Sequence, residues 1–340
     1  TFRPLGVILS IMPWNFPFWQ VIRMAVPTLM AGNTVLLKHA PNCFGTSLLC
    51  QELLKEAASG APEGLFQSLI VDVPQVHTVL EHPAVRGVAL TGSEAAGRAV
   101  AAKAGYLLKK AVIELGGSDP YVLLADADLD QAAEAVVNAR VLNTGQVCIA
   151  PKRVIVDRRV KPDFERLVLE KLAKKVYGVD YGPLASAAFR EQVASQVMAS
   201  QAGGAKLLAG GTDVPAPAGD TGGAFMAPTV LTDVQPGMVA FDEEIFGPVI
   251  SIIEAEGEGH AVELANQSRF GLGGAVFTRD QARGELIAKD SIEAGMCFVN
   301  DFVRSDPSLP FGGIKSSGMG RECHMFGMHE FTNIKTICVK

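Results

Sequence analysis

The chain has 340 residues, of which 48% are hydrophobic and 19% charged, and its formal net charge is −6. This length suffices for two packed domains, and the composition excludes a disordered chain. The mildly acidic balance gives no basis for expecting nucleic acid or an anionic membrane as a partner.

From these residues we expect no membrane span, leader or metal motif. Its longest apolar candidate, residues 25–37, is interrupted by Pro27, Gly32 and Asn33 and is too short to cross a bilayer. No CxxC motif or Cys/His zinc spacing occurs, so we expect no metal and reduced thiols in a cytoplasmic protein. The six cysteines are Cys43, Cys50, Cys148, Cys297, Cys323 and Cys338.

The first third of the chain alternates between strand and helix patterns, which predicts parallel βαβ units with right-handed crossovers. Ligands of such sheets bind beyond the carboxyl ends of the strands. In the helix at 45–58, we expect Leu48, Leu49, Leu53 and Leu54 to form the buried face. The predicted strands are 33–40, 66–71, 85–92 and 109–117, and the predicted helices are 45–58, 73–82 and 93–104.

A second α/β region begins near residue 120. Residues 120–148 predict a strand, a helix with an Asp-rich start and a loop bearing Cys148, followed by a strand at 153–157 and a helix at 161–175. Residues 202–225 are rich in Gly and Pro and indicate a surface stretch. The tail, residues 333–340, predicts an edge strand that pairs either with another subunit or within its own.

A candidate phosphate site lies where a predicted strand runs into Gly92 and then a helix. A helix start offers unpaired N–H groups and a positive dipole end. The spacing resembles a P-loop, but Arg98 and Ala99 stand where Lys and Ser/Thr are needed, so the motif does not favour an NTPase. Taken alone, Gly92 fits an ordinary βα turn at least as well.

Three further residues are candidates for chemistry, each with a structural alternative. Glu114 ends a predicted strand before two glycines and could be a general base or a salt-bridged glutamate. Asn15, between two prolines, could donate to an oxyanion or complete a turn. Cys148 follows the polar loop of residues 143–147, which we expect to be flexible, and precedes an expected helix; it could be a nucleophile, whereas the other cysteines suggest packing.

Together these segments resemble the aldehyde dehydrogenase superfamily over nearly the whole chain. The resemblance rests on "PWNFP", "LLKHAP", "LTGSEAAG", "IELGGSDP", "NTGQVC", "EEIFGPV" and "PFGGIKSSGMGRE" in this order. The "ELGGSDP" and "LLKHAPN" variants are most similar to the bacterial succinate-semialdehyde dehydrogenases.

The resemblance implies a fold and a domain organisation. The expected fold is α/β, with two doubly wound parallel-sheet domains and a terminal oligomerisation strand. It places a cofactor-binding domain at 1–116, a catalytic domain at 117–316 and a C-terminal return segment with the strand at 317–340. The family's N-terminal segment is unmatched, so the cofactor domain is expected to be incomplete, and a homo-oligomer, dimer or tetramer, is expected.

The resemblance also implies site residues. Cys148 would be the nucleophile, Asn15 and the Cys148 N–H the oxyanion donors, and Glu114 the base that hydrolyses the thioester. The cofactor, NAD, would contact Trp14, Lys38, Gly92, Ser93, Glu244 and Phe246. NADP is not excluded, because Pro41 stands where many NAD-using relatives carry a ribose-binding glutamate.

For the substrate, the resemblance suggests succinate semialdehyde, oxidised to succinate. Arg23 would pair with the distal carboxylate, since a guanidinium presents a planar bidentate fork. Leu142 stands where the family has a second arginine; nearby Arg140 could substitute for it, and Ser305 could supply the remaining carboxylate contact. A surface role for Arg23, and a broad specificity for other short aldehydes, stay open.

Two other functions stay open. A cysteine hydrolase would need a histidine base, and none of the six histidines lies in a motif beside Cys148. A non-catalytic remnant acting as an interaction module fits the unmatched N-terminal segment but not the presence of Cys148, Glu114 and Asn15.

Overall fold

The computed structural model describes residues 1–218, 220 and 222–340. The chain forms two compact units, one made of Thr1–Gly116 and Ser305–Lys340 and the other of Gly117–Arg304. Within the described residues, every helix is too short or too polar to span a membrane. Positions 219 and 221 of the predicted surface stretch lie outside the described residues.

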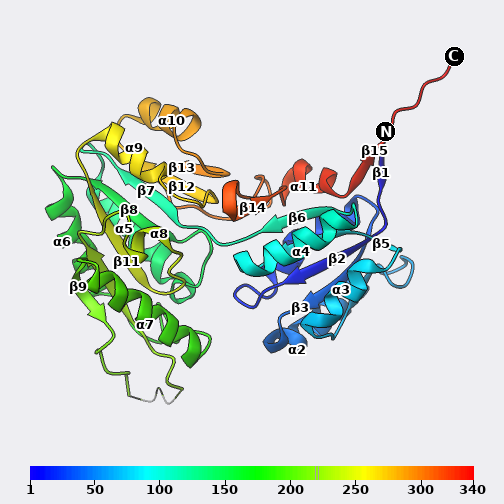
Figure 1. Cartoon of the computed structure of the whole chain (residues 1–340), viewed down its shortest axis with the longest axis horizontal. Helices are drawn as coiled ribbons and strands as arrows, with labels where there is room; N and C mark the ends of the chain where they lie inside the picture. The colour runs from blue at the N-terminus through cyan, green and yellow to red at the C-terminus, as the bar shows by residue number, and fades with distance from the viewer. Residues whose placement is uncertain (219, 221) are drawn as a thin grey trace. The chain divides into compact units, whose positions relative to one another are not determined.

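The first unit is built on a sheet whose strands are parallel except for the last, β14 (Figure 1). The central strand, β2, was not among the predicted elements. In sheet order, the strands are β14 (Gly318–Met319), β6 (Lys110–Glu114), β5 (Val85–Thr91), β2 (Val7–Met12), β3 (Thr34–His39) and β4 (Phe66–Ser68).

Helices cover both faces of this sheet, because side chains of a strand alternate between its faces. Ile8 packs with residues of α1 and α2, and its neighbour Leu9 packs with residues of α3 and α4. The helices are α1 (Trp19–Met30), α2 (Phe44–Ala57), α3 (Val73–Glu81), α4 (Glu94–Tyr106) and α11 (His324–Glu330), with 3₁₀ turns η1 (Pro41–Cys43) and η3 (Lys315–Ser317).

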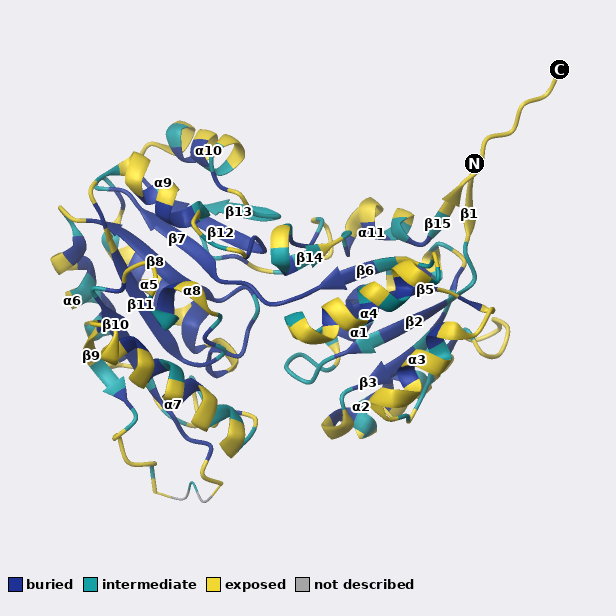
Figure 2. Cartoon of the chain, in the orientation of Figure 1, coloured by how far each residue is buried: buried dark blue, intermediate teal, exposed yellow. Residues whose placement is uncertain are grey.

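The predicted buried face of α2 is wrong for three of its four leucines, since only Leu54 packs against the core. Leu48, Leu49 and Leu53 are 47, 42 and 51% exposed, while Ser47 and Cys50 are buried. The stripe toward the sheet runs through residues 43, 47, 50 and 54, a spacing that also fits a helix. Figure 2 shows the same pattern in other helices, with exposed outer faces above buried strands.

The second unit has a longer sheet, parallel except for β9. Strand β9 lies within the predicted surface stretch, which is therefore partly regular structure. In sheet order, the strands found in the described residues are β13 (Met296–Val299), β12 (Gly273–Phe277), β7 (Asp119–Leu123), β8 (Pro151–Asp157), β11 (Val249–Ala255), β10 (Ala227–Thr232) and β9 (Lys206–Gly211).

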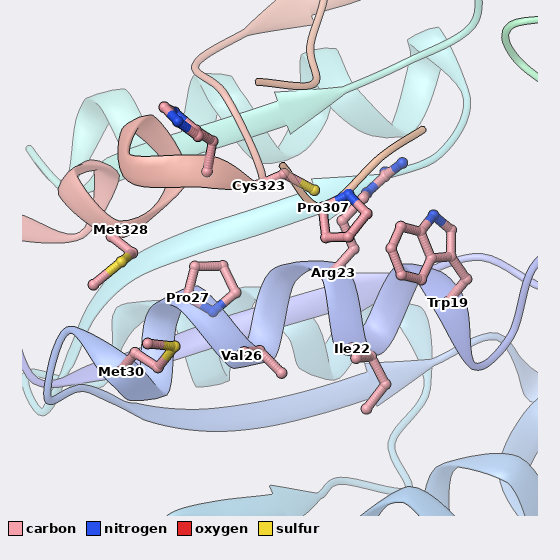
Figure 3. Close-up of a pocket in the computed structure, with 10 residues that line it drawn as sticks. Trp19, Ile22, Arg23, Val26, Pro27, Met30, Pro307, Cys323 and Met328 are labelled. Carbon is pink, nitrogen blue, oxygen red and sulfur yellow. The ribbon is translucent and has the colours of Figure 1, made fainter. Parts of the chain in front are cut away.

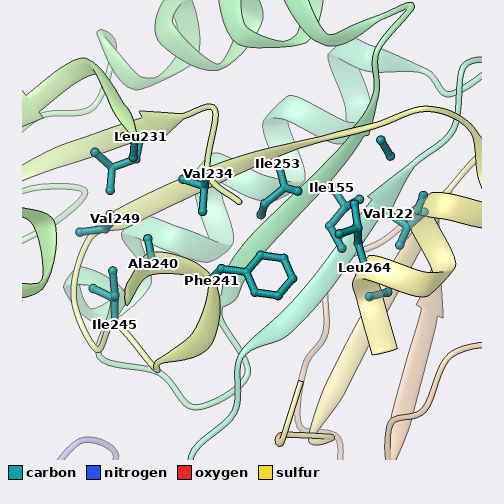
Figure 4. Close-up of a cluster of buried hydrophobic side chains, with 14 of the residues drawn as sticks. Val122, Ile155, Leu231, Val234, Ala240, Phe241, Ile245, Val249, Ile253 and Leu264 are labelled. Atoms are coloured by element: carbon teal, nitrogen blue, oxygen red, sulfur yellow. The ribbon is translucent and has the colours of Figure 1, made fainter. Parts of the chain in front are cut away.

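A hydrophobic cluster packs α7 to α10 against one face of this sheet (Figure 4). Phe241 of α8 lies beside Ile253 of β11 in this cluster, with Leu264 of α9 nearby. Helix α5 contacts β8 and β11 but contributes no residue to the cluster, which places it on the other face. The helical segments are α5 (Leu129–Val141), η2 (Leu142–Gly145), α6 (Lys161–Leu172), α7 (Ala187–Ala202), α8 (Val239–Asp242), α9 (Glu258–Asn266) and α10 (Gln281–Asp290).

The expected fold class, two parallel-sheet α/β units, is confirmed, but the C-terminal boundary differs. Residues 305–316, expected in the second domain, belong to the first unit, and 317–340 is not separate from it. The reason is pairing, since Phe311 and Glu322 exchange backbone hydrogen bonds of 2.8 and 2.7 Å and β14 joins β6.

The chain ends pair with each other in a small antiparallel sheet. Strand β15 (Thr332–Ile334) lies against β1 (Phe2–Pro4) of the same chain. The expected strand at 333–340 is thus shorter and begins earlier, and residues 335–340 form no regular element. Pairing with a second subunit stays a prediction.

Candidate active site

The loop before Cys148 is a constrained turn. Asn143, Thr144 and Gly145 have consecutive positive φ angles of 47, 55 and 73°. A Cβ on Gly145 would lie 2.1 Å from the carbonyl oxygen of Gly247, so this close approach requires glycine. The "NTGQVC" and "EEIFGPV" motifs are therefore in backbone contact.

Polar side chains hold the same loop in place. The Thr144 hydroxyl donates to the Gly182 carbonyl at 3.0 Å and accepts from its N–H at 3.0 Å. The Gln146 amide donates to the Asn143 carbonyl at 3.0 Å and accepts from the Ala185 N–H at 2.8 Å. The expectation of a flexible loop is wrong, because these bonds fix both of its ends.

Cys148 itself is half-buried. The helix expected after Cys148 is not formed, since the described residues 148–150 make a turn that leads directly into β8. The Lys152 ammonium, at the start of β8, donates to the carbonyls of Val147 at 2.9 Å and Cys148 at 2.5 Å. A buried cation thus faces the backbone at the candidate nucleophile.

Glu244 lies in the adjoining motif and is held by the same lysine. Its Oε1 lies 3.0 Å from the Lys152 ammonium and accepts from the Gly117 N–H at 3.2 Å. Its side chain is 21% exposed, and Phe246, two residues on, is half-buried with its ring centroid 6.0 Å from the Lys152 ammonium. One carboxylate oxygen is therefore anchored at a partly exposed position.

Two further buried charged residues, Asp119 and Arg140, lie near Lys152 and the "EEIFGPV" loop. Burial raises the pKa of Asp119 to about 7, and the neighbouring Lys152 opposes that rise. Arg140 is 1% exposed and donates to the Ile245 carbonyl at 2.6 Å. This contact makes Arg140 a support of the "EEIFGPV" loop, which differs from the substrate contact considered from the sequence.

In the first unit, Asn15 follows β2 in a bend between Pro13 and Pro17. Its Oδ1 accepts a 3.0 Å hydrogen bond from the Gln20 amide at the start of α1. That bond uses the acceptor end of the Asn15 amide, so the Nδ2 end is the donor, as an oxyanion contact requires.

Glu114 ends β6 and is 2% exposed. Neither of its carboxyl oxygens has a hydrogen-bond partner among the described residues. Burial, reinforced by Glu322, raises its pKa well above the ordinary value, while Arg23 and Arg321 oppose the rise. Gly312 lies against Glu114, since a Cβ on Gly312 would be 2.5 Å from Glu114 Oε1. Such a carboxyl is a strong proton acceptor once ionised.

Arg23 lies on α1 and is 5% exposed. Its Nε lies 2.5 Å from the Glu322 carboxylate, and its guanidinium stacks 4.0 Å from the centroid of the Phe311 ring. It also lines a groove of about 260 Å³ between α1 and the segment with Pro307 and Cys323 (Figure 3). The side chains that line the groove are mostly apolar, and Arg23 contributes a positively charged guanidinium.

The predicted cofactor residues of this unit occupy strand ends and a helix start. Lys38 is buried on β3, where burial lowers its pKa. Gly92 follows β5, and exposed Ser93 caps α4 by accepting from the Ala96 N–H at 3.3 Å. Trp14 is half-buried beside Asn15.

The remaining candidates are Ser305 and the other thiols. The Ser305 hydroxyl is buried and has no hydrogen-bond partner among the described residues. Cys43, Cys50 and Cys323 are buried and Cys297 is half-buried, but Cys338 is exposed, so it is not a packing residue as expected.

The predicted site residues are divided between the two units. The second unit brings together Cys148, Glu244 and Phe246, and the first contains the others. Sequence reasoning missed Lys152, Asp119 and Glu322, although Asp119 and Glu322 lie inside quoted motifs and Lys152 follows Cys148 by four residues. No cluster of three or more potential metal ligands occurs among the described residues.

Comparison with known proteins gives a consistent answer. The aldehyde dehydrogenase family model matches residues 1–337. A succinate semialdehyde dehydrogenase [NAD(P)+] of Escherichia coli K12 is 46% identical over 99% of this chain and 72% of its own length. A succinate-semialdehyde dehydrogenase [NADP(+)] of Mycobacterium tuberculosis H37Rv is 44% identical over 99% of this chain and 74% of its own.

A solved structure agrees with these relatives. The succinic semialdehyde dehydrogenase of Streptococcus pyogenes, in complex with NADP+, superposes with a TM-score of 0.93 at 38% identity. The match covers 99% of this chain and 74% of that one. By the family match, the identities and the fold, this chain belongs to the aldehyde dehydrogenase family.

Proposed function

We propose that the chain oxidises succinate semialdehyde to succinate with NAD(P)+ and that Cys148 is the nucleophile. The observation that carries the substrate is the 44–46% identity, over 99% of the chain, to succinate-semialdehyde dehydrogenases. Aldehyde oxidation with NAD(P)+ follows from family membership and from relatives named for these coenzymes.

The thiol begins the proposed reaction. Cys148, as thiolate, attacks the aldehyde carbon, and the carbonyl electron pair moves to oxygen to give a thiohemiacetal oxyanion. The Cys148 N–H and the Asn15 amide donate to that oxygen. The Gln20 contact supports this role, because it fixes which end of the Asn15 side chain is the oxygen and which is the N–H donor.

When bound, NAD(P)+ supplies a hydride acceptor. The residues present fit such a cofactor. Glu244 keeps one carboxylate oxygen anchored and a 21% exposed side chain for ribose hydroxyls. Helix α4 offers an exposed N-terminus after Gly92 and Ser93, which suits a pyrophosphate. We also assign Lys38 to the adenosine ribose and Trp14 and Phe246 to the walls of the cofactor site.

The carboxyl completes the cycle. Loss of hydride from the thiohemiacetal leaves a thioester on Cys148, and Glu114 removes a proton from the attacking water. The water oxygen bonds to the acyl carbon, the C–S bond breaks, and the acid leaves. The buried carboxyl of Glu114 supports this role, because neither of its oxygens accepts a hydrogen bond from a described residue.

We assign Arg23, with Ser305, to the distal carboxylate of the substrate. A guanidinium carries five N–H donors, so its pairing with Glu322 through Nε and a contact to a second carboxylate can coexist. The test compares succinate semialdehyde with butanal, using NAD+ and NADP+ and the absorbance of reduced nicotinamide. We expect succinate semialdehyde to have the higher kcat/KM, and a preference for butanal would contradict the proposal.

Arg23 is tested in a matched pair of variants. Arg23→Met alone would leave Glu322 buried without its counter-charge, so it is combined with Glu322→Gln, and Glu322→Gln alone is the control. The double variant is expected to lose roughly 10-fold or more in kcat/KM for succinate semialdehyde relative to butanal. Equal losses for both aldehydes would remove Arg23 from substrate binding.

We also propose a cytoplasmic homo-oligomer. All six cysteines are described and form no disulfide, which favours a reducing compartment. Exposed Ile334, Ile337 and Val339 at the C-terminus support contact with another copy. Light scattering after size-exclusion chromatography tests this, and a monomer at micromolar concentration would contradict it.

A further inference from the structure

Lys152 is a buried ammonium whose contacts lead to two parts of the candidate site. Its side chain is 2% exposed, and its nitrogen lies within 3.0 Å of three oxygens, those of Val147, Cys148 and Glu244 Oε1. An ammonium has three N–H donors, so each donor has an acceptor. Burying a charge is costly without such pairing, and here two of the acceptors are backbone carbonyls at the nucleophile.

The Val147 contact bears on the oxyanion donor. The Val147 carbonyl and the Cys148 N–H belong to one planar trans peptide and point in opposite directions. An ammonium that fixes the carbonyl therefore fixes the direction of the N–H. A charge-assisted bond at the carbonyl also polarises the peptide and strengthens its N–H as a donor.

The Glu244 contact bears on the cofactor. Lys152 and the Gly117 N–H both donate to Oε1. Two donors at one oxygen fix the plane of the carboxylate, and Oε2 has no hydrogen-bond partner in the described part of the chain. The anchored oxygen faces the lysine, and the side chain as a whole is 21% exposed.

We propose that Lys152 is a positioning residue for aldehyde oxidation, whose single ammonium orients both the Cys148 N–H and the Glu244 carboxylate. The inference rests on the proposed function, in which those two groups contact the oxyanion and the nicotinamide ribose. Lys152 touches neither substrate nor cofactor and acts through its neighbours. The Gly145–Gly247 backbone contact supports it, because the two loops already form one packed body.

The test separates the two contacts with two activities. Hydrolysis of p-nitrophenyl acetate without coenzyme uses the Cys148 thiol and oxyanion donor, whereas aldehyde oxidation also uses Glu244. Lys152→Met is expected to slow ester hydrolysis roughly 10-fold and aldehyde oxidation roughly 100-fold, and to raise the KM for NAD(P)+ several-fold. Lys174→Met, at an exposed lysine of the same unit, is the matched control and is expected to change none of them.

A double-mutant cycle with Glu244→Gln isolates the second contact. In the Glu244→Gln background, Lys152→Met is expected to leave the KM for NAD(P)+ unchanged while still slowing ester hydrolysis. Lys152→Gln, which keeps two N–H donors without charge, is expected to restore part of the esterase rate but not the KM. This variant also keeps the test decisive if Lys152→Met fails to fold.

The outcomes distinguish the inference from the proposed function. The positioning role is overturned if Lys152→Met and Lys174→Met have the same esterase and aldehyde oxidation rates per folded molecule. It is also overturned if Lys152→Met raises the KM for NAD(P)+ as much in the Glu244→Gln background as in the unmodified chain. If Cys148→Ala keeps its turnover, or Glu244→Gln keeps its KM for NAD(P)+, the proposed function fails instead. Folded fractions are measured by circular dichroism on the same samples.

Discussion

The two units of this chain use buried charge differently. In the first, two carboxyls, Glu114 and Glu322, share one neighbourhood with Arg23, and Glu114 has no hydrogen-bond partner in the described residues. In the second, buried cations donate to backbone carbonyls. The Lys152 ammonium donates to those of Val147 and Cys148. The Arg153 guanidinium donates to those of Ser118, Leu264 and Ala265. The first arrangement adjusts a proton affinity, and the second fixes geometry.

This difference follows from elementary electrostatics. A buried carboxyl without donors favours its neutral form, so its proton affinity rises. A buried cation is stabilised when carbonyl oxygens accept from its N–H groups, and those hydrogen bonds hold the carbonyls in place. The contrast predicts that changes at Glu114 and Glu322 shift the pH dependence of the reaction, whereas changes around Lys152 shift the positioning of groups at the site.

The largest expected effect comes from the thiol of the second unit. Cys148→Ala is expected to lower aldehyde oxidation by roughly 10³-fold or more, because no other nucleophile replaces it. The absorbance of reduced nicotinamide measures the rate. Cys338→Ala, at the exposed cysteine of the tail, is the control and is expected to keep full activity. Comparable rates for the two variants would remove Cys148 from the mechanism.

The next effect sharpens the role of the first unit. Glu114→Gln is expected to slow thioester hydrolysis about 10²-fold, with a smaller effect on acylation, because general bases contribute about this much. Since the pKa of Glu114 is raised, hydrolysis in the unmodified chain should increase with pH until the carboxyl ionises. Rapid-quench kinetics across pH follow both steps.

Glu322→Gln provides the matching change in that profile. It removes a like charge that raises the pKa of Glu114 and leaves Arg23 to lower it further. The rising limb is expected to move to lower pH. A limb that stays in place would exclude coupling between the two carboxyls.

Positioning in the second unit can be broken at Gly145. Gly145→Ala places a Cβ 2.1 Å from the Gly247 carbonyl at a φ of 73° and is expected to cost about 3 kcal/mol of unfolding free energy. Gly178→Ala is the matched control, with a φ of 81° and no described atom within 4 Å, and is expected to cost about 1 kcal/mol. Urea unfolding measures both, and equal costs would show that the loops do not require this contact.

The final prediction is a pH dependence of stability at Asp119. Its pKa is about 7 in the folded chain, above the ordinary 3.8, so the folded state binds more protons between these values. Stability from this group is therefore present below about pH 4 and is lost as pH rises toward 7, by up to about 1.4 kcal/mol per pH unit. Asp119→Asn should flatten that slope in urea unfolding series, and an unchanged slope would assign it to another group.

The sequence predicted the architecture because alternating strands and helices leave clear periodic patterns. The prediction of the buried face failed in α2, where two sets of residues both have helical spacing. The leucines at 48, 49 and 53 lie on the exposed face, and residues 43, 47, 50 and 54 face the sheet. It did not indicate that the polar loop before Cys148 is rigid, since its positive φ angles depend on contact with Gly247, about 100 residues away.

The candidate site was predicted residue by residue through family resemblance, but its support was not. Lys152 immediately precedes the strand predicted at 153–157 and, in sequence alone, is indistinguishable from a solvated lysine. Its burial depends on the carbonyls of one loop and the carboxylate of another. Glu322 pairs with Arg23 across almost the whole chain, a separation that no local pattern encodes.

The central claim is that one reaction uses the thiol of the second unit to form a thioester and the carboxyl of the first to release it. The most direct measurement is the mass of the Cys148-bearing peptide from Glu114→Gln after brief reaction with succinate semialdehyde and NAD(P)+. The account predicts a succinyl group on Cys148 that accumulates in this variant and not in the unmodified chain. An unmodified Cys148 peptide, in a variant that still reduces the coenzyme, would contradict it.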